Sequence, residues 1–207
     1  MKLLISYDDR YRHDSTGIYF KRAFQKLLGK ENAVHVYNDK LKDVSPGEFD
    51  FHLKVDDGLN WHKWDKRLKP WGYYVIDSHL DLDWRQAIVK EAGGADKLFF
   101  AQKPALLAPW DCQDLIWSPL AADEEVHSPS RKWEKKYDTC FIGHFHSQYA
   151  EERAKYVDAL FSALPNFFFG TRFFQDMADM FAQTRLVFNK SLNSDINMRF
   201  YEAQMSG

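Results

Sequence analysis

The chain has 207 residues, 45% of them hydrophobic, and a formal net charge of −2. This composition excludes a disordered chain, and the lack of a basic excess argues against nucleic acid as the main partner. There are only two cysteines, Cys112 and Cys140, and no apolar run reaches the roughly 18 residues needed to cross a bilayer. We therefore expect no secreted disulfide framework, no transmembrane segment and a cytoplasmic location.

The first part of the chain alternates β-like apolar runs with helical runs. The expected strands lie within residues 2–6, 33–38, 49–58, 72–81, 97–102 and 114–120, and the expected helices within 18–30 and 83–95. Strands that alternate with helices favour a parallel sheet with helices on its faces. We therefore predict a first α/β domain over residues 1–120.

The composition changes at Ala121. Residues 121–136 are highly charged and lack an apolar period, which is typical of a linker. The alternation then restarts, with strands expected within 137–143, 166–170 and 185–191 and helices within 147–164 and 173–183. Sheets usually carry about five or six strands, so we expect residues 137–207 to be the first part of a second domain in a longer, C-terminally truncated protein.

Polar residues follow the expected strands, at the edge where α/β sheets bind ligands. The first domain offers Asp56, Asp57 and Gly58, then Asp77, Ser78 and His79; the second offers Gly143 and His144, then Asn189, Lys190 and Ser191, and finally Asn197, Met198 and Arg199. Helix N-termini aided by Lys or Arg favour phosphate. A Glu one turn later, Glu202, would accept hydrogen bonds from ribose hydroxyls. The pattern predicts a nucleotide diphosphate.

Structural alternatives remain open for these residues. Asp77 and His79 could cap a helix and satisfy a buried carbonyl, and Lys190 could be an ordinary surface lysine. Arg199 and Glu202 have the spacing of an intrahelical ion pair.

Two further patterns bear on metal binding. His144 and His146 have a spacing that could hold a metal, but no third ligand is evident and a solvated loop is favoured. Asp56 and Asp57 precede Gly58, which is typical of a turn. We expect no metal and no other cofactor.

Several segments resemble CgeB-like, spore-maturation-type bacterial glycosyltransferases of the GT-B fold (glycosyl transferases group 1). They are "VIDSHLD", "FFAQKP", "IWSPLAAD", "YDTCFIGHF" and "FFQDMADMFAQTRLVFNKSLNSDINMRFYEAQMSG". The most specific part reads Asn-Met-Arg, two apolar residues and Glu-Ala, and Gln204-Met205 departs from the small residues expected next. The resemblance implies two Rossmann-like, doubly wound units, the second incomplete here. A nucleotide-sugar donor would bind mainly to the second unit and an unknown acceptor (glycan, protein or small molecule) mainly to the first.

The resemblance also implies roles for individual residues. Gly143 lets the backbone approach the diphosphate, Glu202 holds the ribose, and His79 lies near the transferred sugar. We add Lys190 and Arg199 on the diphosphate side and Asp77 as an alternative to His79 at the acceptor hydroxyl. The expected site residues are therefore Asp77 and His79 for catalysis and Gly143, Asn189, Lys190, Asn197, Arg199 and Glu202 for the donor.

These residues predict a glycosyltransferase, with a retaining outcome favoured. Because the expected donor pocket is incomplete, we expect the chain alone to bind nucleotide diphosphates weakly. Two other functions stay open: a GT-B nucleotide-sugar epimerase, and a catalytically inactive GT-B fragment that acts as a binding module.

Overall fold

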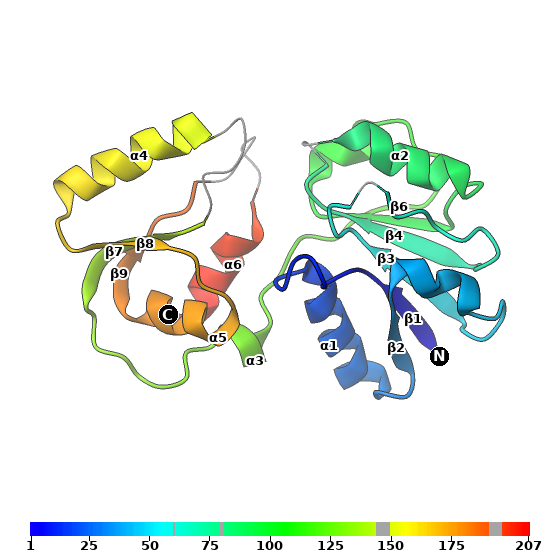
Figure 1. Ribbon diagram of the computed structural model, residues 1–207, viewed down its shortest axis with the longest axis horizontal. Helices are drawn as coiled ribbons and strands as arrows, with labels where there is room; N and C mark the ends of the chain where they lie inside the picture. Colours follow the sequence, from blue (N-terminus) through cyan, green and yellow to red (C-terminus); the bar gives the residue numbers. More distant parts are fainter. Residues whose placement is uncertain (60, 79–80, 144–149, 191–195) are drawn as a thin grey trace. The chain divides into compact units, whose positions relative to one another are not determined.

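The structure is a computed structural model that describes residues 1–59, 61–78, 81–143, 150–190 and 196–207. The chain divides into two compact units, Met1–Pro119 and Leu120–Gly207, and each has its own parallel sheet (Figure 1). The predicted α/β architecture with parallel sheets is confirmed. Among the described residues, no helix combines the length and the apolar character needed to cross a bilayer.

The sheet of the first unit has six parallel strands in the order β2-β1-β3-β4-β5-β6. The strands are β1 (Leu3–Ser6), β2 (Ala33–Val36), β3 (Phe51–Val55), β4 (Trp71–Val75), β5 (Lys97–Phe100) and β6 (Leu115–Trp117). The central strands β1 and β4 are buried along their whole length. Burial on both faces explains why they appear in the sequence as continuous apolar runs.

Two helices, α1 (Thr16–Leu28) and α2 (Leu82–Glu91), cover opposite faces of this sheet. Tyr74 of β4 packs against Phe20 of α1, with ring centroids 4.5 Å apart. Its neighbour Tyr73 points to the other face, where it shares a core cluster with Ile88 of α2. Two 3-10 helices, η1 (Asn38–Asp43) and η2 (Lys103–Leu107), complete the unit.

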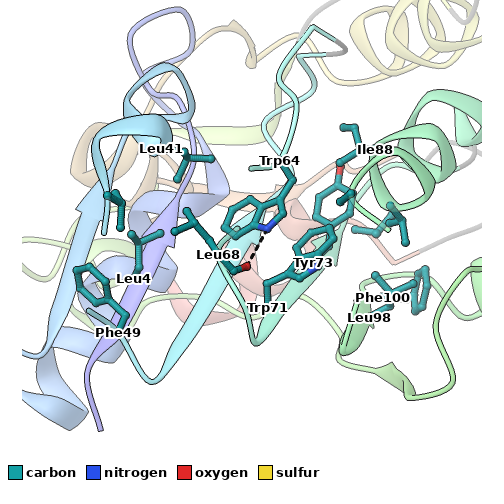
Figure 2. Close-up of a cluster of buried hydrophobic side chains, with 14 of the residues drawn as sticks. Leu4, Leu41, Phe49, Trp64, Leu68, Trp71, Tyr73, Ile88, Leu98 and Phe100 are labelled. Carbon is teal, nitrogen blue, oxygen red and sulfur yellow. Dashed lines mark hydrogen bonds between the residues drawn. The ribbon is translucent and has the colours of Figure 1, made fainter. Parts of the chain in front are cut away.

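The core of the first unit is rich in aromatic side chains (Figure 2). Trp64 and Trp71 stack nearly parallel, with centroids 4.8 Å apart and an interplanar angle of 11°. The indole Nε1 of Trp64 donates to the backbone oxygen of Leu68 at 3.3 Å, so this buried polar group is satisfied. Most of the aromatic content of the first unit therefore serves packing.

Helix α1 approaches β1 closely at Gly17. A Cβ built at this position would lie 2.0 Å from Cγ of Tyr7, which is buried directly after β1. Only glycine leaves room for this contact, so Gly17 fixes how α1 packs beside the end of β1.

The second unit has a three-stranded parallel sheet in the order β8-β7-β9. Its elements are α3 (Glu124–His127), β7 (Tyr137–Ile142), α4 (Ala150–Ala163), β8 (Phe167–Gly170), α5 (Phe174–Ala182), β9 (Thr184–Val187) and α6 (Met198–Met205). Cys140 and Ile142 of β7 form the core with Met177 and Phe181 of α5. The helix expected within residues 173–183 thus contributes core side chains, although Phe173 itself is exposed.

The segment interpreted from the sequence as a linker, residues 121–136, belongs to this second unit. Ser130 donates to the carboxylate of Asp179 in α5 from its backbone nitrogen at 2.6 Å and its hydroxyl at 2.7 Å. Ser206, just after α6, donates to the backbone oxygen of His127 at 2.8 Å, and His127 is fully buried. Residues 124–130 therefore pack against α5 and the end of α6.

Each sheet contains one point where the strand order reverses. In the first unit it lies between β1 and β3, because β1 has β2 on its other side; in the second it lies between β7 and β9. In open parallel sheets, ligands bind outside the carboxyl ends of the strands at this reversal. Each unit therefore has one position where a ligand site is expected.

Candidate functional site

At the reversal point of the first unit, Asp57 is the centre of a buried polar network. It follows β3, and its Oδ2 accepts hydrogen bonds from the backbone nitrogen of Asp8 at 3.0 Å and from Nδ2 of Asn38 at 2.8 Å. Nδ1 of His62 lies 3.2 Å from the same oxygen. Burial alone would raise the pKa of Asp57, but the His62 hydrogen bond and the charge of Lys54 bring it below its usual value.

Lys54 is the next-to-last residue of β3 and is only 1% exposed. Its Nζ donates to Oδ1 of Asn38 at 3.2 Å, and the hydroxyl of Ser6 donates to the same oxygen at 2.8 Å. Burial lowers the pKa of Lys54, while the charges of Asp57, Asp56 and Asp8 oppose that shift. The amide of Asn38 thus accepts a hydrogen bond from a buried cation, Lys54, and donates one to a buried carboxylate, Asp57.

Asp8 extends the network from β1. Arg10 donates to both of its carboxylate oxygens and also to Oδ1 of Asp39 at 2.9 Å. Nε2 of His62 lies 3.7 Å from Oδ2 of Asp8. The Arg10 hydrogen bond lowers the pKa of Asp8, with a smaller contribution from His62. His62 therefore lies between two carboxylates, with Asp57 beside Nδ1 and Asp8 beside Nε2.

Asp56 has a different surrounding. Its carboxylate forms a buried ion pair with Arg85 of α2 and also accepts from the backbone nitrogens of Ile76 at 3.1 Å and Gly58 at 3.0 Å. These contacts hold α2 and the end of β4 against the end of β3. Asp56 is accounted for by this structural role.

Of the residues predicted for catalysis, Asp77 lies at the carboxyl end of β4 and is half-buried. Its backbone has a φ of 50°, in the left-handed region that non-glycine residues rarely adopt. Such strain is concentrated at functional sites. His79 lies outside the described residues, so its role stays a prediction.

At the reversal point of the second unit, Gly143 follows β7 and donates from its backbone nitrogen to Gly170 at 3.2 Å. A Cβ at Gly143 would lie 2.9 Å from the ring of Phe141. After β9, the amides of Asn189 and Asn197 exchange two hydrogen bonds, of 2.9 and 3.1 Å. Asn197 is the N-cap of α6 but makes no side-chain cap bond. Its amide therefore fixes the start of α6 to the end of β9.

Three cations lie after β9 or in the first turns of α4 and α6. Lys190 follows β9 and pairs with Glu152 in the first turn of α4, with Nζ 3.1 Å from Oε1. Arg199 of α6 and Arg153 of α4 are close enough that the charge of Arg199, together with burial as the larger cause, lowers the pKa of Arg153. Lys190 and Arg199 each pair with a single carboxylate, Glu152 and Glu202, so an anion bound here would share each of these cations with one carboxylate.

Glu202 is 6% exposed and is held from two sides. Nη1 of Arg199 lies 2.8 Å from its Oε2, which is the intrahelical ion pair left open by the sequence. Nε2 of His127 lies 3.4 Å from its Oε1. Nδ1 of His127 accepts from the backbone nitrogen of Asp123 at 2.9 Å, which holds the ring beside the carboxylate. The carboxylate of Glu202 is thus fixed in position.

Within the described ranges, no three His, Cys, Asp or Glu side chains are arranged to hold a metal ion. His144, His146 and Ser191 lie outside these ranges. The expectation that no metal is required stays a prediction.

Sequence reasoning placed Asp57 and the residues after β9 at the strand ends but did not single out four others. Asn38, Lys54 and His62 join the network around Asp57, and Arg153 joins the cations of the second unit. Lys54 had one usable signal, a charge inside a strand that a parallel sheet buries on both faces. No protein-family model matches the chain, and no curated protein sequence is similar enough to count as a relative.

Proposed function

We propose that the chain is a glycosyltransferase, or the leading part of one, of the GT-B type, in which the second unit binds a nucleotide-diphosphate-sugar donor. The observation that carries the proposal is the set of three cations, Arg153, Lys190 and Arg199, supplied by three elements around the reversal point of the second sheet. Gly143 follows β7 at the same edge of the sheet and has no side chain that would keep a ligand away from the backbone.

A diphosphate suits this arrangement for two reasons. Arg and Lys form charge-assisted hydrogen bonds with phosphate oxygens, and the start of α6 lacks a cap from its own Asn197 side chain. In sugar transfer the bond between the anomeric carbon and the diphosphate oxygen breaks, so negative charge grows on the leaving group. Positioned cations and N–H groups stabilise that charge.

The carboxylate of Glu202 fits a ribose contact only if it keeps some capacity to accept. An ionised carboxylate offers about four lone-pair sites; Arg199 uses one on Oε2, and His127 lies 3.4 Å from Oε1. A purely structural role for Glu202 explains the same contacts, which favours the inactive binding module as the second candidate.

The acceptor belongs to the first unit in this proposal. The acceptor oxygen forms the new bond to the anomeric carbon, and its proton passes to a base. Asp77, with its strained backbone at the end of β4, is our proposed group for the acceptor hydroxyl, with His79 as its predicted partner.

The test measures whether UDP, GDP, ADP and dTDP bind to the chain. Saturation-transfer NMR monitors the binding because it detects weak ligands. We expect one diphosphate to bind without added metal. Lys190→Ala should weaken it about tenfold because one phosphate contact is lost. The matched control is Lys155→Ala, an exposed lysine of α4, which should bind as the unaltered chain does.

The proposal fails if none of the four diphosphates binds, or if Lys190→Ala binds as tightly as Lys155→Ala. Where binding is found, product analysis with the matching nucleotide sugar separates the candidates. Transfer that requires an acceptor supports a transferase, an altered donor without acceptor indicates an epimerase, and an unchanged donor indicates a binding module.

A further inference from the structure

Two large, solvent-exposed aromatic side chains contact each other at the reversal point of the first unit. Tyr11 is 71% exposed and follows β1, and Trp61 is 61% exposed and follows β3. Their ring centroids are 6.4 Å apart and the rings are nearly perpendicular, at 87°. An edge-to-face contact holds each ring in place and leaves ring surface open. We call this pair the aromatic platform.

Polar groups lie directly beside the platform. The ring of His62 is 5.7 Å from that of Trp61, and the guanidinium of Arg10 is 6.0 Å from the ring of Tyr11 and 4.4 Å from that of Tyr37. The hydroxyl of Tyr37 donates to Asp9 at 3.2 Å. Aromatic surface therefore adjoins carboxylates and hydroxyls that can bond to a ligand.

The charges beside the platform are already paired with one another. Arg10 is shared between the carboxylates of Asp8 and Asp39. An anionic ligand would have to compete with two carboxylates for this guanidinium. The ligand that fits is therefore uncharged.

We infer that the aromatic platform of Tyr11 and Trp61 binds a neutral carbohydrate. The faces of a pyranose ring carry C–H groups that pack on aromatic rings, while the hydroxyls at its edge bond to carboxylates such as those of Asp9 and Asp39. This carbohydrate is the acceptor, and only that last identification rests on the proposed function. A nucleotide would also stack on the rings, but its phosphates would face the carboxylates.

The test measures binding of cellohexaose, xylohexaose, mannohexaose and chitohexaose to the chain by calorimetry, with no donor present. We expect at least one of them to bind, and Tyr11→Ala and Trp61→Ala each to raise its Kd about tenfold or more. Trp61→Phe should keep most of the affinity because it retains a ring.

The matched control is Trp117→Ala. Trp117 is 47% exposed at the end of β6 and lies under the ammonium of Lys103, away from the strands that carry the platform. This variant should bind as the unaltered chain does. Because both platform residues are exposed, circular dichroism should show that all variants fold.

Three results would overturn the inference: no binding of any hexasaccharide, equal losses in Trp61→Ala and Trp117→Ala, or tighter binding of UMP or hexagalacturonic acid than of the neutral sugars. The outcome is independent of the diphosphate assay. Carbohydrate binding without diphosphate binding would remove the proposed transferase and keep the platform, and the reverse result would do the opposite.

Discussion

Asn189 and Asn197 face each other at the edge of the second sheet, and the Nδ2 of each donates to the Oδ1 of the other. The pair joins the end of β9 to the N-cap of α6, which are eight positions apart in the chain. This pair of hydrogen bonds therefore fixes the start of α6, the helix that carries Arg199 and Glu202.

Because the two amides bond to each other, we expect the effects of replacing Asn189 and Asn197 on stability to be coupled. Asn189→Ala and Asn197→Ala should each lower the free energy of unfolding by about 1 kcal/mol. The double variant should cost clearly less than the sum of the two, because the same pair of bonds is removed. Urea unfolding of the four proteins measures the cycle. Strictly additive losses would show that the two amides do not stabilise each other.

Asp57 should make the free energy of unfolding fall as the pH is lowered into the acid range. Its pKa is lower in the folded chain than the ordinary carboxyl value of about 3.9 in the unfolded chain. Its contribution is therefore present above that ordinary value and is lost as the pH falls through the folded pKa. Asp57→Asn should flatten the decline in stability below about pH 5. Urea unfolding between pH 3 and 7 checks this, with the exposed Asp43→Asn as control. Equal acid slopes for the two variants would contradict it.

Gly17→Ala should destabilise the first unit, although the intrinsic helix propensity of alanine exceeds that of glycine by about 1 kcal/mol. The new methyl group would overlap the ring of Tyr7, and overpacking of this kind typically costs about 1–3 kcal/mol. Thermal unfolding followed by circular dichroism gives the sign. In a Tyr7→Leu background the same substitution should cost much less, and a stabilised Gly17→Ala would refute the close contact.

Cys140 should be protected from thiol reagents in the native protein. It is fully buried in β7, and burial raises its pKa to about 11, so the reactive thiolate is scarce near neutral pH. In a Cys112→Ser variant, labelling with a disulfide reagent at pH 8 should proceed only as fast as the second unit opens. Rapid labelling without denaturant would place this thiol at the surface.

The sequence predicted the strands well where both faces are covered. Residues 3–5 and Trp71–Val75 form apolar runs because helices pack on each side of the sheet, and polar residues follow these runs at the strand ends. The second sheet was predicted equally well from the runs at β7, β8 and β9.

The networks around Asp57 and Glu202 could not be predicted in the same way. Lys54 is a charged residue inside a strand that is buried on both faces, and its burial depends on Asn38 and Asp57 from other parts of the chain. His127 lies in a charged segment without apolar period, and what buries it is contact with α6, which is distant in sequence. Such positions are set by tertiary contacts that local patterns do not contain.

The parallel indoles of Trp64 and Trp71 have a spectroscopic consequence. At 4.8 Å their transition dipoles couple, so the ultraviolet absorption and circular dichroism of this pair should change when the first unit unfolds and the rings separate. All tryptophans except Trp133 also lie in this unit. Indole signals therefore report the melting of one half of the polypeptide almost alone, while the Cys140 thiol reports the other half.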